Sequence, residues 1–127
     1  MSITLKGISG EKLAREILIE MGLDRIFQAD WLIKKNSKWY VVEVKHKEMF
    51  KPPPFSGHGL DIRQVKIRQQ FYKDVGIRCL FLVIDAETND IYWQWLDVLE
   101  KTKYFDTRNN VRIYNIEEFN NYVRRCE

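Results

Sequence analysis

Cysteine is scarce in this sequence, and long hydrophobic runs are missing from it. The two cysteines, Cys79 in an apolar segment and Cys126 near the end of the chain, give neither a disulfide framework nor a metal-ligand spacing, so reduced thiols are the simplest expectation. The longest apolar run, residues 79–84, is the length of a strand and far short of the roughly 20 residues that span a membrane. The first residues lack the basic and apolar regions of a signal peptide, which predicts a cytoplasmic protein with no membrane partner.

The remaining composition is typical of a folded domain. Hydrophobic residues make up 45% of the chain and aromatic residues 13%, which excludes an intrinsically disordered protein. The sequence has no internal repeat, and 127 residues are enough for one domain with its own core. We therefore expect residues 1–127 to form a single domain.

The net charge of +3 hides an uneven distribution along the chain. Residues 34–73 contain ten Lys or Arg and three acids, a local charge of +7, so the rest of the chain carries −4. Such a basic segment suits a polyanionic partner such as DNA. A solvated face that only keeps the protein soluble is the alternative.

Residues 26–46 have the pattern of two strands joined by a turn at Asn36 and Ser37. A symmetric turn at this place sets the register and puts Asp30 directly opposite Glu43. Side chains alternate between the two faces of a strand, so one face of this hairpin is apolar and we expect it in the core. That face comprises Phe27, Ala29, Trp31, Ile33, Tyr40, Val42 and Val44.

The other face of the hairpin carries Asp30 and Glu43, with Lys45 two residues further along. Like charges directly opposed across two strands destabilise the pair. A divalent cation would reverse the sign of that interaction, because Mg²⁺ is bound by one or two carboxylates together with waters and phosphate oxygens. The alternative is that both carboxylates are solvated on an open sheet face and that Lys45 relieves their repulsion.

Periodicity and turn residues predict the remaining elements. An amphipathic helix over 9–22 presents Leu13, Ile17 and Met21, and a second over 61–75 presents Ile67, Phe71 and Val75, with Gln64 one turn earlier. The apolar strand 77–84 is typical of a sheet covered on both faces. The other predictions are a loop over 46–60, a strand over 91–96, a helical turn near 98–101, a strand over 111–116 and a terminal helix over 117–125.

The predicted loop offers residues that suit DNA. Lys47 and Lys51 can meet phosphates while Phe50 and Phe55 stack on bases, although the two rings can equally pin the loop to the core. His58 is a candidate for phosphate contact or proton transfer, as is His46, although a lone histidine is more often structural. The basic residues of the second helix that we expect at DNA are Arg63, Lys66 and Arg68.

Glu11 and Gln64 each lie near the start of a predicted helix, and each has a structural explanation that requires no functional role. Glu11 lies in the first turn of its helix, where the helix dipole favours a carboxylate whatever its function. Asp61 and Gln64 have the spacing of a capping box, in which Gln64 bonds back to the Asp61 backbone.

The order of these features resembles the PD-(D/E)XK nuclease superfamily, which includes restriction endonucleases and archaeal-type Holliday junction resolvases. The resemblance covers about residues 7–96 and is carried by Glu11, Asp30, the tripeptide Glu43-Val44-Lys45 and Gln64. The sequence departs from the pattern at Ala29, where the family usually has proline, and in the seven residues between Gly22 and Asp30, which leave little room for the strand that normally comes first.

The resemblance implies an α/β fold with a three-layer restriction-endonuclease-like core, in which helices flank a mixed central sheet. It also implies Mg²⁺, with Mn²⁺ able to substitute, bound by Asp30, Glu43 and the Val44 carbonyl, with Glu11 assisting through a water. Lys45 would position and help deprotonate the attacking water or stabilise the transition state, and Gln64 would orient water or a phosphate oxygen.

Three functions remain open at this point. The first is a Mg²⁺-dependent DNA endonuclease, selective for branched DNA or acting as a homodimer that cuts two strands. The second is a nucleic-acid-binding module without catalysis, although such a surface has no need of opposed carboxylates. The third is a protein-interaction domain that uses Trp93 and Trp95, although burial under the terminal helix explains these two residues more simply.

Overall fold

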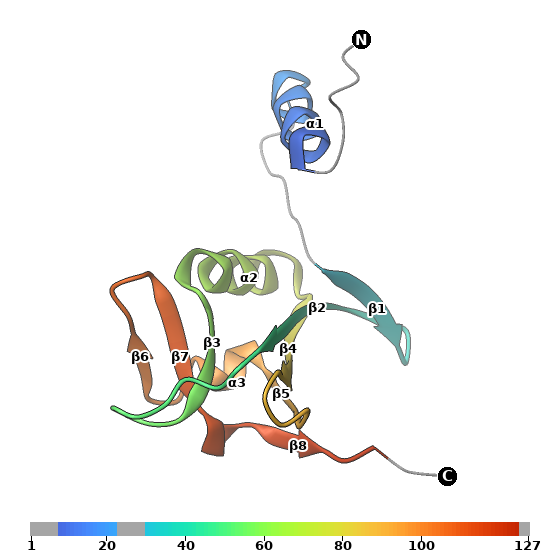
Figure 1. The fold of residues 1–127 in the computed structure, drawn as a ribbon. Coiled ribbons are helices and arrows are strands. Elements are labelled where there is room, and N and C mark those ends of the chain that lie inside the picture. The colour runs from blue at the N-terminus through green and yellow to red at the C-terminus, as the bar shows by residue number, and fades with distance from the viewer. Residues whose placement is uncertain (1–7, 23–29, 125–127) are drawn as a thin grey trace.

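The computed structural model describes residues 8–22 and 30–124, and Figure 1 shows strands as its main component. The second predicted helix forms where expected: it begins after Asp61, whose carboxylate accepts a hydrogen bond from the Arg63 N–H at 2.8 Å, and it ends at Gly76, which has a φ of 80°. No helix in these two ranges is long and apolar enough to cross a membrane. The helical elements are α1 (Ile8–Glu20), α2 (Ile62–Val75), α3 (Leu96–Leu99) and the 3-10 turn η1 (Ile116–Glu118).

The centre of the fold is a five-stranded mixed sheet, which confirms the predicted α/β fold with a mixed sheet and flanking helices. The pairing of β2 with β4 is parallel, and the other three pairings are antiparallel. Helix α2 lies on the crossover between the two parallel strands. In spatial order the strands are β1 (Trp31–Lys35), β2 (Lys38–Lys47), β4 (Arg78–Asp85), β5 (Ile91–Trp95) and β8 (Asn120–Tyr122).

The β1–β2 hairpin has the predicted register. Lys34 pairs with Trp39 across the turn, and Asn36 and Ser37 have φ angles of 51° and 68°. Positive φ at both central residues is the requirement of a type I′ turn, whose twist matches that of the strands. The predicted residues 26–29 lie outside the described part of the chain.

The predicted loop over 46–60 is partly wrong, because its end is a strand. Strand β3 (Gly57–Asp61) pairs with β7 (Val111–Asn115), which pairs in turn with β6 (Tyr104–Asp106), so these strands form a second, antiparallel sheet. Gly57 permits the close approach of β3 to β7, since a Cβ atom there would lie 2.0 Å from the Tyr114 carbonyl oxygen. A Cβ atom at Gly59 would likewise lie 2.5 Å from the Arg112 carbonyl oxygen, so Gly57 and Gly59 mark a close backbone contact instead of a flexible segment.

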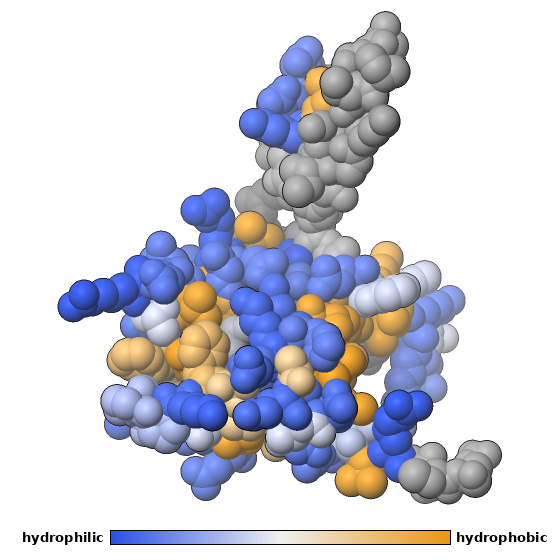
Figure 2. Space-filling view, in the orientation of Figure 1, coloured by the Kyte–Doolittle hydropathy of each residue, from blue (hydrophilic) through white to orange (hydrophobic). Residues whose placement is uncertain are grey.

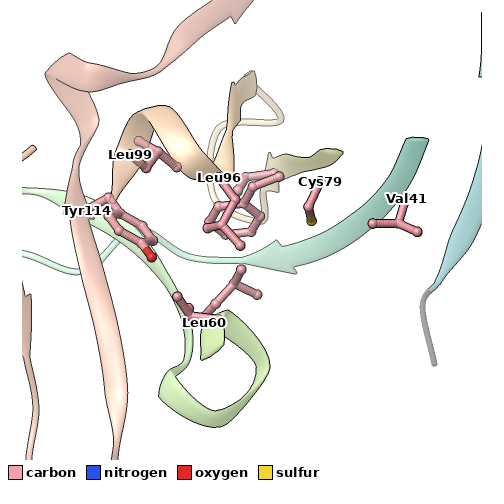
Figure 3. Packing of buried hydrophobic residues seen from close by; sticks show 9 residues of the cluster. Val41, Leu60, Cys79, Leu96, Leu99 and Tyr114 are labelled. Carbon is pink, nitrogen blue, oxygen red and sulfur yellow. The ribbon is translucent and has the colours of Figure 1, made fainter. Parts of the chain in front are cut away.

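The hydrophobic core lies on one face of the five-stranded sheet, between that sheet and the layer formed by α2, α3 and the second sheet. The sheet contributes Val41, Cys79, Phe81 and Val83 to it. Figure 3 shows this cluster from close by, with Leu60, Leu96, Leu99 and Tyr114 arriving from the other elements. On β2, the core face is therefore the one that carries Val41 and Glu43, which corrects the predicted assignment of its two faces.

The opposite face of the sheet, predicted to be covered, lines an open apolar groove of about 790 Å³. Strand β4 alternates between buried and half-buried residues, so only one of its faces is sealed. Figure 2 shows hydrophobic side chains bordering the hollow on the hairpin side of the molecule. The apolar side chains that line the groove are Ile33, Tyr40, Leu80, Leu82, Ile84, Ile91, Trp93, Trp95 and Tyr122.

Two predicted apolar stripes are partly exposed. In α1, Leu13 is half-buried and Ile17 is 45% exposed, and Met21 just beyond the helix is 69% exposed. In α2 the buried side is shifted by one position, because Val65 and Arg68 are buried while Ile67 and Val75 are exposed.

The predicted terminal helix over 117–125 is wrong in the described part of the chain. The Asn115 side chain caps a single 3-10 turn by accepting the Glu117 N–H at 3.0 Å, and the chain then continues as β8 beside β5. Asparagine is a weak helix former, and two of them, Asn120 and Asn121, follow at the point where a helix would have to propagate. Trp93 and Trp95 consequently border the groove instead of lying under a helix.

The close β3–β7 contact predicts a large cost for a methyl group at Gly57. Gly57→Ala should lower the free energy of unfolding in urea by roughly 2–4 kcal/mol, because the two strands must separate to admit the Cβ atom. Gly76→Ala is the matched control: a Cβ there meets nothing within 4 Å, so only left-handed backbone strain of about 1 kcal/mol remains. Equal losses of stability in the two variants would contradict the packing explanation.

Candidate active site

The predicted carboxylate pair lies at the open end of the β1–β2 hairpin. Asp30 immediately precedes β1, and its Oδ2 accepts a hydrogen bond from the Val44 N–H at 2.9 Å. The register that pairs Trp31 with Val42 places Asp30 opposite Glu43 when it is continued by one residue. Asp30 is exposed whereas Glu43 is 1% exposed, so the two carboxylates differ sharply in their access to water.

The electrostatics of Glu43 reflect this burial. Loss of hydration raises the pKa of Glu43, the guanidinium of Arg68 lowers it, and the charge and hydrogen bonding of Asp30 raise it again, with a net increase. The register of the hairpin places the two carboxyl groups opposite each other, which accounts for the contribution of Asp30. Their mutual repulsion is the electrostatic condition that a cation relieves.

Arg68 of α2 is the partner of Glu43, a contact that sequence reasoning missed. Its Nε donates to Glu43 Oε1 at 2.7 Å, and its Nη2 forms an ion pair with the same oxygen. Arg68 itself is 5% exposed. The sequence signal was its spacing, because Arg68 lies four residues after Gln64 and therefore on the same helix face.

The other predicted catalytic residues lie around this pair. Lys45 is half-buried on β2, two residues after Glu43 and hence on the same face of the strand. Gln64 is half-buried in the first turn of α2, on the face from which Arg68 reaches Glu43. The predicted contribution of Glu11 lies outside the side chains that the structure describes.

The donor set suits a hard cation with few protein ligands. Among the side chains that the structure describes, no three His, Cys, Asp or Glu residues converge as a metal cage would require. Mg²⁺ does not need such a cage, because it commonly keeps several waters and binds through one or two carboxylates and the phosphates of its substrate. Asp30 and Glu43 therefore fit Mg²⁺, and the Val44 carbonyl would be the further ligand that the resemblance implies.

The predicted basic residues divide into surface and interior groups. Lys47, Lys51, Arg63 and Lys66 are exposed. Arg63 and Lys66 line a polar hollow of about 330 Å³ together with Asn109 and Asn110, two residues that sequence reasoning missed because they are distant in the chain. Arg68 is in the interior, where it faces Glu43 instead of a surface ligand.

His58 is also in the interior, which leaves it no open path to a phosphate. It is 2% exposed, its ring lies 6.0 Å from that of Tyr92, and its Nε2 lies 3.3 Å from Asp85 Oδ2 without hydrogen-bond geometry. Burial lowers the pKa of His58, and the neighbouring Asp85 opposes that shift only in part. His58 thus links β3 to the end of β4.

Comparisons with known proteins find similar chains among solved structures. The chain is similar to Hjc, a Holliday junction resolvase from the archaeal hyperthermophile Archaeoglobus fulgidus, with 14% identity over 82% of this chain and 87% of that chain and a TM-score of 0.44. No protein-family model matches the sequence, and no curated protein matches it. Similarity at this level carries no information about activity.

The buried His58 predicts a component of acid sensitivity. Its folded pKa is below the ordinary 6.5, so the unfolded chain binds the proton first and the free energy of unfolding should fall as pH drops below about 6.5. In urea titrations between pH 7.5 and 5.5, His58→Gln should show a shallower fall than the parent. His46→Gln, at an exposed position on β2, is the matched control and should follow the parent. Equal slopes for the parent and His58→Gln would contradict the prediction.

Proposed function

We propose that this protein is a Mg²⁺-dependent nuclease that hydrolyses DNA phosphodiester bonds. We further propose that it prefers branched DNA to linear DNA. The observation that carries the proposal is the opposition of Asp30 and Glu43 at the end of one hairpin, with Lys45 on the same face of β2. Two carboxylates beside a basic surface are costly for simple phosphate binding, since they repel the ligand.

Each residue has a role that its position permits. A bound divalent cation lowers the pKa of a water ligand and neutralises charge on the phosphoryl oxygens. Asp30 and Glu43 would hold that ion, and the Val44 N–H fixes the Asp30 carboxylate through its hydrogen bond. Lys45 would orient the attacking water or stabilise the charged transition state, and Gln64 would orient a water or phosphate oxygen.

The phosphate backbone would lie across the exposed basic residues of α2 and of the segment after β2. Arg63 and Lys66 line the polar hollow at the start of α2. Lys47 is the last residue of β2, the strand that carries Glu43, and Lys51 lies in the segment that follows it. Phosphate contacts of this kind fix the position of DNA without reading its sequence. The surface therefore supports binding by backbone shape and charge.

A second candidate function has one observation in its favour. The negative charge of Glu43 is already balanced within the protein by Arg68, as it would be in a nucleic-acid-binding module that has no catalysis. Such a module would keep DNA affinity and show no dependence on divalent ions. The two functions therefore differ in one measurable property, metal-dependent strand cleavage.

We expect the protein to cut at least one of plasmid, linear and four-way-junction DNA in Mg²⁺ or Mn²⁺ and to be inactive in EDTA. Glu43→Gln, which keeps the side-chain volume, should lower the cleavage rate at least about 100-fold by removing a metal ligand. Lys45→Ala should reduce the rate similarly and leave DNA affinity nearly unchanged, because one lysine contributes little to a broad phosphate interface. No cleavage of any substrate, with tight binding retained, would favour the binding module.

Charge reversal on α2 tests the binding surface separately. Arg63→Glu combined with Lys66→Glu should weaken DNA binding, and the slope of log affinity against log salt should fall by about 1 for each phosphate that is no longer neutralised. Lys101→Glu with Lys103→Glu makes the same change in net charge at two exposed positions after α3 and should have a smaller effect. Equal effects of the two pairs would remove α2 from the proposed interface.

A further inference from the structure

Arg68 is an unusual residue for its position in the fold. It comes from the buried face of α2, between Val65 one turn earlier and Phe71 one turn later, both of which contact the apolar core. Only 5% of its surface is exposed, and its guanidinium forms an ion pair with Glu43, a side chain that is 1% exposed. A buried position next to apolar neighbours would ordinarily be occupied by an apolar residue.

Stability alone does not explain this pair. Burying two charges costs hydration energy that their attraction only partly returns, and well-packed apolar residues of similar volume often do as well or better. A buried ion pair in this place is therefore better explained by what it does to Glu43, which the proposed function makes a metal ligand.

The contact between Arg68 and Glu43 involves one particular carboxylate oxygen. The Arg68 Nε and Nη2 both approach the same carboxylate oxygen of Glu43, Oε1. Arginine presents these donors in a rigid plane, and both converge on Oε1, so the contact fixes the position of that carboxylate oxygen. Asp30 lies opposite Glu43 when the β1–β2 register is continued by one residue, so Glu43 has the guanidinium and the second acidic residue as neighbours.

We infer that Arg68 is a positioning residue: it holds Glu43 through Oε1 so that the carboxylate is fixed in the orientation that shares a divalent cation with Asp30. This inference rests on the proposed metal-dependent function. Carboxylates that bind metals are themselves commonly held by hydrogen bonds from a second layer of residues, whose loss typically costs 10- to 100-fold in metal affinity. Arg68 has the burial and contacts of such a residue, and its interior location explains why it does not take the DNA-contacting role predicted from its charge.

The test is Mn²⁺ binding to the full chain without DNA, measured by electron paramagnetic resonance of free Mn²⁺ and by calorimetry. Arg68→Met keeps a long side chain without donors and should weaken Mn²⁺ binding at least about 10-fold. Arg68→Lys keeps the charge without the planar fork and should give an intermediate affinity. Lys73→Met, at an exposed position in the last turn of the same helix, is the control and should bind as the parent does.

All titrations are performed at least about 15 °C below the midpoint of thermal unfolding of the least stable variant, so that affinity is compared among folded proteins. If Arg68→Met does not fold, Arg68→Lys decides alone, and parental affinity in that variant overturns the inference. Unchanged or tighter binding by folded Arg68→Met also overturns it, and tighter binding would show that Arg68 competes with the cation for Glu43. Absence of Mn²⁺ binding in the parent would instead refute the proposed metal-dependent function itself.

Discussion

The parallel pairing of β2 with β4 is the constraint on which the rest of this structure depends. Parallel neighbours cannot be joined by a tight turn, so the chain must leave the end of β2, cross one face of the sheet and return. That crossover carries α2 over the face of β2 that bears Glu43. The same pairing therefore closes the core and delivers Arg68 to the carboxylate.

The carboxylate pair of the site is determined by local sequence, whereas its contact with Arg68 depends on tertiary packing. Asp30 and Glu43 are brought together by the hairpin, whose turn and register are encoded within a few residues. The burial of Glu43 and its contact with Arg68 require the crossover and the packing of α2 on β4. The carboxylate pair can thus form early, whereas its electrostatic environment is complete only when the sheet is assembled.

This division explains what could be predicted from the sequence. The hairpin register, the limits of α2 and the opposition of the carboxylates follow from turn residues and side-chain alternation, which are local properties. Local properties do not decide whether Arg68 or Ile67 faces the core. Adjacent helix positions differ by about 100°, and the apolar pattern alone assigned the buried side to Ile67. The strand that begins at Gly57 was predicted to be part of a loop, because its close approach to Tyr114, 57 residues later in the chain, cannot be seen in the local pattern.

The two carboxylates differ in exposure, so the site has one side that faces water and one side that faces the protein interior. Helix α2 and the core close off Glu43 from behind, whereas Asp30 stands in water at the mouth of the hairpin. The pair thus has an outer member, Asp30, and an inner member, Glu43. A ligand shared by both carboxylates would face water on the Asp30 side and the protein interior on the Glu43 side.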